Sequence, residues 1–351
     1  MRGSEISKIG VIGAGSWGTT LANLLAGKGF EVNLWAREEE VFQEIKNRRV
    51  NGLFLPEVEL DARLRPVRSF EEALREKELV LLVVPSHVFR QVLTNIKPYL
   101  RPDMLLMAAT KGIENESLMM MSQVAASELD VNCLLKFACL AGPSFAKEVC
   151  QKYPTAVTIA SRDMEHAERL QRAFYTDFFR VYVTQDLIGA QLGGALKNVI
   201  AIAAGAADAL RFGHNARAAL ITRGLAEIAR LGVAMGANPL TFAGLAGMGD
   251  LVLTCTGDLS RNRTVGLKIG AGMRLEEITG SMKMVAEGIN TARSAYELGR
   301  KMDVEMPITT QVYQILYEGK DPREAVKELM TRGLKAELEH EAPIPFNKGS
   351  S

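Results

Sequence analysis

The feature that most constrains the fold is a glycine-rich turn, GAGSWG over residues 13–18, which lies between two periodic patterns. The short apolar run IGVI precedes it at residues 9–12, and a helical pattern from residue 16 to residue 28 follows it. A second strand-like run, EVNLWA, occupies residues 31–36. This order of strand, glycine turn, helix and strand is typical of a dinucleotide-binding unit, whereas a GxGxxG run without that context is a weak signal.

The three glycines of the turn have separate physical roles in such a unit. Gly13 permits the tight turn, Gly15 lets the backbone approach a pyrophosphate, and Gly18 lets the helix pack closely on the strand. The start of the helix offers free N–H groups and the positive end of its dipole to the phosphates. We therefore expect a nicotinamide dinucleotide here, and the alternative is a purely structural turn.

The end of the second strand indicates which dinucleotide is bound. An acidic residue there hydrogen-bonds the 2′-hydroxyl of NAD, whereas an arginine accommodates the 2′-phosphate of NADP. Arg37 follows the EVNLWA run directly, and glutamates occupy residues 38–40. These glutamates equally suit the solvated first turn of the next helix. The pattern predicts use of either NADH or NADPH, with Arg37 favouring tolerance of NADPH.

The arrangement of periodic patterns along the chain predicts two domains. Apolar strand-like runs alternate with helical patterns in the first half, which predicts a mostly parallel, doubly wound sheet with helices on both faces. From Asp186, a residue type favoured as a helix N-cap, the periodicity becomes helical. We predict an α/β dinucleotide-binding domain over residues 1–185, an all-helical domain over residues 186–340 and a disordered tail over residues 341–351. The further strand-like runs lie at residues 79–84, 104–109, 136–141, 155–161 and 178–184.

Charge and hydropathy exclude two kinds of partner. A net charge of +1 provides no global field for nucleic acid or an anionic membrane, so a phosphorylated ligand would need a local group of donors. The apolar stretch at residues 187–207 is long enough to span a bilayer, but Lys197 lies in its middle, which favours a buried core helix. No signal-peptide pattern opens the chain, so we expect a cytoplasmic protein without membrane insertion.

The cysteines and histidines indicate neither a disulfide framework nor a metal site. Four cysteines show no CxxC spacing and are expected to be thiols in a reducing compartment. Four scattered histidines form no HExxH pair, so no metal is expected. The residues concerned are Cys133, Cys139, Cys150, Cys255, His87, His166, His214 and His340.

Polar residues follow two strand-like runs of the first domain. Lys111 comes after the run at 104–109, and the loop that contains Gly142 and Ser144 comes after the run at 136–141. The carboxyl ends of parallel strands open at one edge of a sheet, where α/β folds bind their ligands. Lys111 and this loop are therefore expected to meet a small polar ligand, although an exposed strand-end residue is the alternative for each.

Lys197 is the sharpest candidate for acid–base chemistry. It lies in mid-helix among apolar residues, with Gly193 and Ala201 one turn away, and these small neighbours would leave room for a ligand. Burial lowers the pKa of a lysine toward neutrality, as a general acid or base for an alcohol/carbonyl pair requires. The alternative is an amine that reaches the surface or pairs with an acid.

The tetrapeptide SRNR at residues 260–263 follows a glycine-rich stretch, GLAGMGD at residues 244–250. Its two arginines, flanked by hydroxyl and amide donors, suit a phosphate, because guanidinium groups bind phosphate oxygens bidentately. An ordinary charged loop would be the better interpretation of this tetrapeptide if it stood alone.

Together these motifs resemble the bacterial NAD(P)-dependent glycerol-3-phosphate dehydrogenase family. Several are weak individually, but in this order and spacing they are specific, and they cover most of residues 8–335. The matching stretches are GAGSWGT (13–19), ATKG (109–112), GPSFAKEV (142–149), LKNVIAIAAG (196–205), NARAALITRGL (215–225), GLAGMGDLVLTCTG (244–257) and SRNR (260–263).

The resemblance implies a Rossmann domain, a helical domain and an active site in the cleft between them. It implies the reversible NAD(P)H-dependent reduction of dihydroxyacetone phosphate to sn-glycerol 3-phosphate, which would supply glycerophospholipid synthesis; we also expect a homodimer. The implied catalytic residues are Lys197 as proton donor and acceptor, Lys111, Asp250, Asn198 and Thr254. Lys111, Lys197 and Asp250 would also contact the substrate, together with Gly142, Ser144, Ser260, Arg261 and Asn262. Ser16, Trp17, Arg37, Lys111, Ala146, Arg261, Val285 and Glu287 would join the three glycines in contacting the cofactor.

One position departs from the family pattern, and two other functions stay open on the sequence alone. Phe54 stands where many relatives carry tyrosine, so any contact of that hydroxyl with the cofactor is missing. A dehydrogenase of this architecture could act on another phosphorylated or β-hydroxyacid substrate, as 6-phosphogluconate or ketopantoate-type reductases do. A sensor that binds NAD(P)H without turnover is the non-enzymatic alternative. The SRNR motif and Lys197 count against both.

Overall fold

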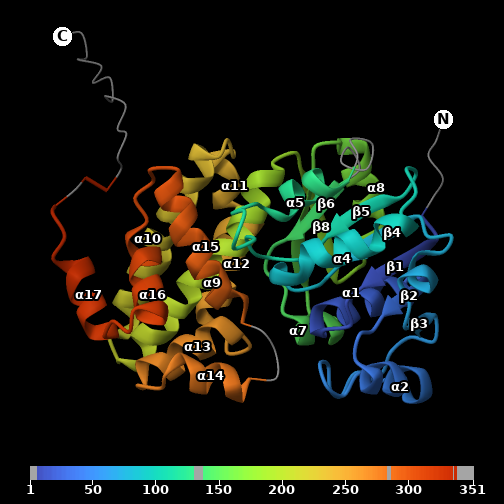
Figure 1. Ribbon diagram of the computed structural model, residues 1–351, viewed down its shortest axis with the longest axis horizontal. Helices are drawn as coiled ribbons and strands as arrows, with labels where there is room; N and C mark the ends of the chain where they lie inside the picture. The colour runs from blue at the N-terminus through green and yellow to red at the C-terminus, as the bar shows by residue number, and fades with distance from the viewer. Residues whose placement is uncertain (1–5, 130–136, 283–285, 335, 338–351) are drawn as a thin grey trace, which may run out of the picture.

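The computed structural model describes residues 6–129, 137–282, 286–334 and 336–337, and it places an α/β region beside an all-helical region (Figure 1). The strands are β1 Lys8–Ile12, β2 Glu31–Trp35, β3 Leu64–Val67, β4 Leu79–Leu82, β5 Leu105–Ala108, β6 Phe137–Ala141, β7 Thr155–Ser161 and β8 Phe179–Thr184. The helices of the α/β region are α1 Ser16–Gly27, α2 Glu39–Arg48, α3 Phe70–Leu74, η1 Ser86–Val88, α4 Phe89–Ile96, η2 Lys97–Tyr99, α5 Met121–Glu128, α7 Ala146–Cys150 and α8 Met164–Phe174. The tail predicted at 341–351, Cys133 and His340 lie outside the described residues.

The sheet has the strand order β3-β2-β1-β4-β5-β6-β7-β8. Neighbouring strands run parallel except for β6 and β7, which confirms the predicted mostly parallel, doubly wound sheet. The pattern of apolar runs does not predict β3, because its sequence LRPV contains an arginine and a proline. Proline is tolerated there since β3 is an edge strand, where a missing N–H leaves no neighbour without a partner.

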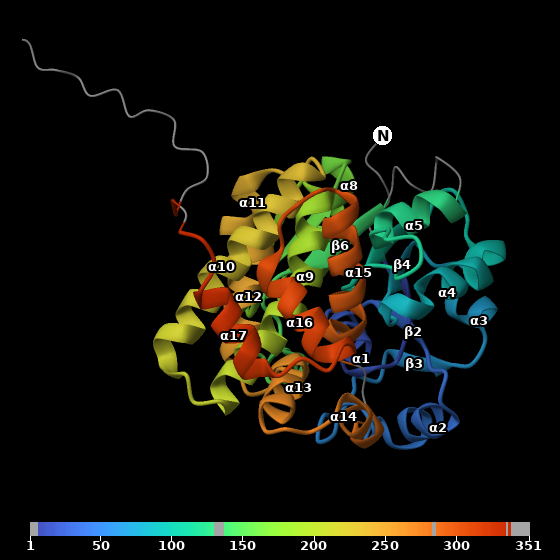
Figure 2. The same cartoon turned by 60° about the vertical axis from the view of Figure 1, so that its left-hand side comes forward.

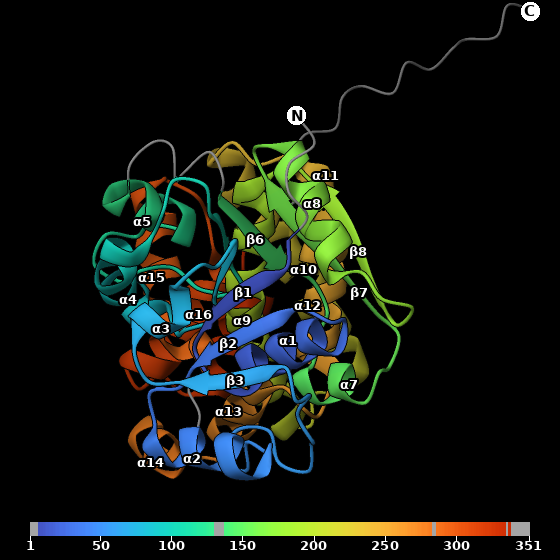
Figure 3. The same cartoon turned by 90° about the vertical axis from the view of Figure 1, so that its right-hand side faces the viewer.

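Helices cover both faces of the sheet, as Figure 3 shows with α1, α7 and α8 on one side and α3, α4 and α5 on the other. Successive residues of β4 alternate between the faces: Leu81 packs in the core with Leu21 of α1, and Leu82 packs in the core with Phe89 of α4. Burial on both faces explains why the central strands read as continuous apolar runs.

The helical region is built around α9, and none of its described residues forms a strand of the sheet. Its helices are α9 Leu187–Ala209, α10 Gly213–Ala234, α11 Pro239–Ala243, the π-helical turn η3 Leu245–Gly249, α12 Asp250–Thr256, α13 Arg261–Gly270, α14 Leu275–Ser281, α15 Glu287–Lys301, α16 Pro307–Tyr317 and α17 Pro322–Met330. Asp186 caps α9 as predicted, because its carboxylate accepts a 2.8 Å hydrogen bond from the Gly189 N–H. Figure 2 shows other helices of this region surrounding α9. Among the described helices α9 alone is long and apolar enough to cross a membrane, but 89% of its apolar window is buried, which makes it the core helix.

Helices α9 and α13 approach closely because glycines occupy their crossing. A Cβ at Gly205 would lie 2.1 Å from the carbonyl oxygen of Arg263, and a Cβ at Gly266 would lie 2.0 Å from the carbonyl oxygen of Ile202. Neither position has room for a methyl group, so the backbones of the two helices are in direct contact. This contact holds the first turn of α13 beside the helix that carries Lys197.

We predict that Gly266→Ala destabilises the protein, because the added methyl group must push α13 away from α9. Overpacking of this kind typically costs about 1–3 kcal/mol, so the midpoint of urea unfolding should fall. Gly280→Ala on α14 is the matched control, since nothing lies within 4 Å of the place that its Cβ would occupy. The control should be neutral or more stable by about 0.5–1 kcal/mol. Equal midpoints for the two variants would contradict the close-approach interpretation.

Candidate functional site

The glycine turn between β1 and α1 forms a cradle that fits a dinucleotide. Gly13 has a φ of +117°, and a Cβ there would lie 2.5 Å from the carbonyl oxygen of Val83. A Cβ at Gly18 would lie 1.9 Å from the carbonyl oxygen of Gly13, so this position also requires glycine. Nothing lies within 4 Å of a Cβ placed at Gly15, which caps α1 without any side chain. The space beside Gly15 and the start of α1 therefore suit a pyrophosphate.

A loop after α2 supports this cradle. The buried Asn51 donates through its amide to the carbonyl oxygen of Ala14 at 2.9 Å and to the Thr19 hydroxyl at 2.8 Å. The Ser16 hydroxyl donates to the carbonyl oxygen of Phe54 at 2.5 Å. The backbone of residue 54 thus supports the cradle, and this contact does not depend on the side chain at that position. Asn51 was not predicted, because a single asparagine in a loop carries no distinctive signal.

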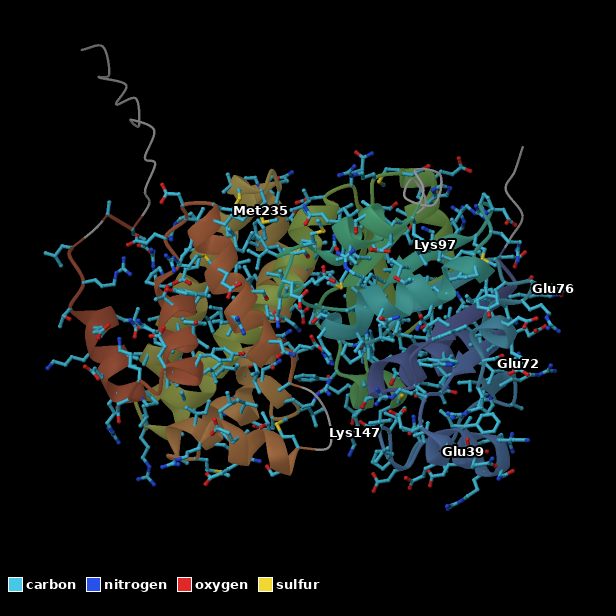
Figure 4. The ribbon with its side chains drawn as sticks, in the orientation of Figure 1. Glu39, Glu72, Glu76, Lys97, Lys147 and Met235 are labelled. Carbon is cyan, nitrogen blue, oxygen red and sulfur yellow. The ribbon has the colours of Figure 1, made fainter. Side chains whose placement is uncertain are left out.

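Two arginines lie at the end of the cradle where a ribose is expected. Arg37 follows β2 and forms a 2.7 Å ion pair with Glu38, while most of its side chain stays exposed. Arg68, at the end of β3, donates to the carbonyl oxygen of Ala36 at 2.8 Å and pairs with Glu39 at 3.2 Å. The glutamates at residues 39 and 40 lie in the first turn of α2, and Figure 4 labels Glu39 there. Arg68 was not predicted because the edge strand that ends beside it was not.

The remaining residues predicted to contact the cofactor come from separate elements. Trp17, in the first turn of α1, packs against the core of the α/β region. Ala146 begins α7, and its carbonyl oxygen accepts a long, 3.5 Å hydrogen bond from the Thr20 hydroxyl of α1. Figure 4 labels the next residue, Lys147, whose ammonium lies 3.9 Å from a carboxylate oxygen of Glu57 in the α/β region. Val285 lies outside the described residues.

Glu287 begins α15 and connects the helical region to the α/β region. Its carboxylate accepts a 2.5 Å hydrogen bond from the hydroxyl of Ser86, which begins η1 just after β4. Burial raises the pKa of Glu287, and the Ser86 hydrogen bond opposes that shift. A Cβ at Gly112 would lie 2.5 Å from the Ser86 hydroxyl oxygen and 3.2 Å from the Glu287 carboxylate, so the three residues pack together. Ser86 was not predicted, since one serine after a strand is a weak signal.

The centre of the candidate site is the carboxylate of Asp250, which is fully buried at the start of α12. One oxygen accepts from Lys197 of α9, and the other accepts from Lys111 at 2.6 Å. Lys111 also donates to the carbonyl oxygen of Gly142 at 3.3 Å. The structure therefore brings the ends of β5 and β6 to one place, as expected, and adds an aspartate from the helical region.

The surroundings of Lys197 correct one expectation drawn from the sequence. Gly193 does not leave room for a ligand, because a Cβ there would lie 2.3 Å from the carbonyl oxygen of Ala246. The space is filled by the backbone of η3, the turn that leads into Asp250. The small residue lets η3 approach α9, which brings the aspartate to the lysine.

Lys197 is both buried and paired with an acid, two properties that the sequence analysis treated as alternatives. It is buried and it pairs with Asp250, and its ammonium also donates to the Thr254 hydroxyl at 2.8 Å. Burial lowers the pKa of Lys197 to about 7, with Asp250 raising it and Lys111 lowering it. A lysine with a pKa near neutrality can give or take a proton under physiological conditions.

The first turn of α13 forms a candidate anion site. Ser260 is its N-cap and accepts from the Arg263 N–H at 3.2 Å, which leaves the N–H groups of Arg261 and Asn262 without a partner inside the helix. The side chain of Arg261 is exposed, and among the described residues no carboxylate lies within ion-pair distance of it. Helix N–H groups and an unpaired guanidinium together suit a phosphate.

Arg263 does not belong to this anion site, contrary to the expectation that both arginines of SRNR hold a phosphate. Its guanidinium bonds Asp208 at 2.8 Å and 3.0 Å, and it also pairs with Asp258 at 3.0 Å. Arg217 shares Asp208 at 3.2 Å. Residues two apart on a helix point in different directions, so the Arg263 side chain meets α9 instead of a ligand.

The other polar side chains of the site form hydrogen bonds with groups of the protein. The Ser144 hydroxyl donates to the carbonyl oxygen of Gly142 at 3.1 Å. The Asn262 amide donates to the side-chain oxygen of Asn198 at 2.8 Å and accepts from the Gly288 N–H at 2.9 Å. The two asparagines thus join α9, α13 and α15 beside Lys197.

Comparisons with known proteins identify the family. Two family models match: the NAD-dependent glycerol-3-phosphate dehydrogenase N-terminus over residues 8–167 and the C-terminus over residues 186–327. The glycerol-3-phosphate dehydrogenase (NAD(P)+) of Geobacter metallireducens is 61% identical over 330 residues, which cover 94% of this chain and 98% of that protein. The crystal structure of glycerol-3-phosphate dehydrogenase from Coxiella burnetii is 39% identical, with a TM-score of 0.90 over 94% of this chain and 100% of that one. A ketopantoate reductase from Ralstonia eutropha, 15% identical with a TM-score of 0.57 over 91% of this chain and 99% of that one, shares the fold alone.

We predict that Asp250→Asn lowers the pKa of Lys197 further, by about one unit or more, because the negative charge that raises it is removed. The measurement is a pH titration of the lysine Cε carbon by carbon-13 NMR, with the Lys197 signal assigned by its loss in Lys197→Ala. Glu31→Gln, which neutralises the partner of the buried Lys77 far along the sheet, is the matched control. An unchanged or higher pKa of Lys197 in Asp250→Asn would show that the carboxylate does not govern this lysine.

Proposed function

Because this chain belongs to the NAD(P)-dependent glycerol-3-phosphate dehydrogenase family and interconverts dihydroxyacetone phosphate and sn-glycerol 3-phosphate, we propose that Lys197 exchanges the proton of that reaction. The observation that carries this proposal is the pairing of Lys197 with the buried Asp250, together with a pKa of about 7. The amine would stand at the C2 oxygen of the substrate, where a proton is gained on reduction and lost on oxidation.

The residues around the glycine turn fit the cofactor. Gly13, Gly15 and Gly18 would hold its pyrophosphate against the start of α1, and Arg37 with Arg68 would face the 2′ position of the adenosine ribose. Lys111 follows the carboxyl end of β5, and Glu287 bonds Ser86, which follows the carboxyl end of β4. Both residues would meet the nicotinamide end of the cofactor. When bound, the nicotinamide supplies or accepts the hydride.

Asp250 and Lys111 would set the charge around the reacting oxygen. Two ammonium groups share one buried carboxylate, so the cluster carries one uncompensated positive charge when both lysines are protonated. Negative charge that develops on the C2 oxygen would meet this preorganised positive charge in a water-poor environment. Thr254 would hold Lys197 in line, because its hydroxyl accepts from the amine and donates to the Asp250 carbonyl oxygen at 2.6 Å.

The substrate phosphate would bind at the first turn of α13. Arg261 would supply a guanidinium, and the N–H groups of Arg261 and Asn262 would complete the site with the Ser260 cap beside them. Binding energy from this remote group would orient C2 toward Lys197. The loop with Gly142 and Ser144 would meet the substrate from the α/β side, next to Lys111.

The same proposal covers the division into domains, the localisation, the oligomeric state and the physiological role. We infer two functional domains divided at residue 185, since β8 ends at Thr184 and the Asp186 cap opens α9. A cytoplasmic homodimer that supplies glycerol 3-phosphate for glycerophospholipid synthesis accords with the family. The likeness to a ketopantoate reductase is limited to the fold, so it supports no ketopantoate-type substrate for this chain.

We predict opposite pH profiles for the two directions of the reaction, followed by NADH absorbance. The protonated fraction of Lys197 falls as pH rises through about 7, so kcat for reduction should fall and kcat for oxidation should rise over that range. Lys197→Ala should lose about 10²–10⁴ in kcat and lose this pH dependence, while it still binds NADH. Absence of turnover by folded wild-type protein would refute the activity, and normal turnover by the variant would refute only the role of Lys197.

We predict that Arg37→Ala penalises NADPH more than NADH, because in the proposed arrangement the guanidinium would contact the 2′-phosphate that only NADPH carries. A lost charged hydrogen bond of about 1.5–3 kcal/mol corresponds to a fall of roughly tenfold or more in kcat/KM for NADPH. Arg48→Ala, an exposed arginine at the end of the following helix α2, is the matched control. Equal losses with the two cofactors would contradict this assignment.

A further inference from the structure

The adenosine end of the cofactor cradle contains a carboxylate to which the proposed function gives no role. Glu38 accepts from the Nε and Nη2 groups of Arg37 at 3.0 Å and 2.7 Å, and both hydrogen bonds reach the same carboxylate oxygen, Oε1. No residue in the described part of the chain donates a hydrogen bond to the other oxygen. The Glu38 side chain is 30% exposed, so a ligand at this edge can reach that oxygen.

Glu38 occupies the N-cap position of α2 without capping the helix. An N-cap side chain commonly accepts from a backbone N–H of the first turn of its own helix, but the Glu38 side chain forms no such hydrogen bond. Its carboxylate instead meets Arg37, which precedes it in the chain. The next glutamate, Glu39, pairs with Arg68 at 3.2 Å. Capping of α2 therefore does not explain the orientation of Glu38.

Backbone hydrogen bonds hold this ion pair beside the glycine turn. The Gly13 N–H donates to the carbonyl oxygen of Trp35 at 3.3 Å, which joins the turn to the end of β2. From the other side, the guanidinium of Arg68 donates to the carbonyl oxygen of Arg37. The charges of Arg37 and Glu38 are thus placed at the end of the cradle where the adenosine ribose is expected.

A carboxylate at this place has opposite effects on the two cofactors. The 2′-hydroxyl of NADH can donate to the free oxygen of Glu38, whereas the 2′-phosphate of NADPH must either take Arg37 from Glu38 or bind next to the carboxylate. An exposed ion pair changes an equilibrium by about fivefold at most, so Arg37 is released easily. Repulsion between two negative charges about 4 Å apart costs about as much in water and more near a protein surface. The repulsion is therefore the larger effect.

We propose that Glu38 is a specificity-determining residue that shifts cofactor selectivity toward NADH, because its carboxylate accepts from the 2′-hydroxyl of NADH and repels the 2′-phosphate of NADPH. The guanidinium of Arg37 supplies the attraction that still lets NADPH bind. The adjacent opposite charges thus give the protein access to both cofactors, with a selectivity set by their balance. This inference rests on the proposed position of the adenosine ribose beside Arg37.

Binding measurements on the full chain test this role without turnover. The selectivity ratio is the Kd of NADH divided by the Kd of NADPH, each from a titration of nicotinamide fluorescence. We expect Glu38→Gln to raise this ratio by about tenfold, because NADH loses a charged acceptor and NADPH loses a repulsive charge. Glu40→Gln is the matched control, since it removes an equal charge from an exposed position two residues further along α2. Its ratio should stay within about twofold of the wild-type ratio.

Adenosine 2′,5′-bisphosphate confines the test to the ribose end, because it carries the 2′-phosphate but no nicotinamide. Glu38→Gln should bind it about fivefold more tightly than the wild type does, as measured by isothermal titration calorimetry. High ionic strength should reduce this gain, because salt screens exposed charges. A gain that is equal at low and high salt would count against repulsion as its cause.

Arg37→Ala separates failure of this inference from failure of the ribose position on which it rests. An unchanged Kd of adenosine 2′,5′-bisphosphate in Arg37→Ala would refute the ribose position itself. If Arg37→Ala weakens that ligand but Glu38→Gln shifts the selectivity ratio no more than Glu40→Gln does, the ribose position stands and the role of Glu38 is overturned. Glu38 and Glu40 both reach solvent, so the two glutamine variants should unfold at the wild-type temperature and any shift in selectivity cannot come from lost folding.

Discussion

The site depends on the buried carboxylate of Asp250. Two lysines from opposite regions of the protein would repel each other across this space, and a buried ammonium without a counter-charge is strongly disfavoured. With Asp250 between them, Lys111 of the α/β region and Lys197 of the helical region share one acceptor. The same carboxylate therefore joins the two regions electrostatically and keeps a lysine of lowered pKa in the interior.

Glycines bring the groups of the site within reach of one another. Gly193 admits the η3 backbone that leads to Asp250, and Gly205 with Gly266 lets α13 lie against α9. Gly288 lets the start of α15 lie directly against Asn198 and Asn262. Each close approach carries an attached polar group toward α9. The site is assembled by backbone contact more than by long side chains.

Much of the fold can be predicted from the sequence, because the patterns that indicate its strands, helices and glycine turn are local. Buried strands appear as apolar runs, Asp186 marks the change to helices, and the glycine turn requires its strand and helix. The edge strand β3 and the Arg68 that follows it escape prediction, since a short polar strand has no apolar run. The family motifs predict the candidate site residues, but not how these residues pair. That Arg263 bonds Asp208, or that Ser86 bonds Glu287, depends on tertiary packing that no local pattern encodes.

Lys197 and Asn198 are adjacent residues of α9, and their side chains leave the helix about 100° apart. Lys197 bonds Asp250, and Asn198 bonds Asn262 of α13. In the proposed function, Lys197 would carry the proton chemistry and Asn198 would face a helix that holds a ligand. An offset of one residue along α9 therefore separates the side chain proposed for proton transfer from the side chain that faces the neighbouring helices. An insertion or deletion of one residue upstream in α9 would rotate both functions out of place together. We therefore expect new substrate specificity in this fold to evolve by substitutions and by changes in the surrounding loops, while the length of α9 stays fixed.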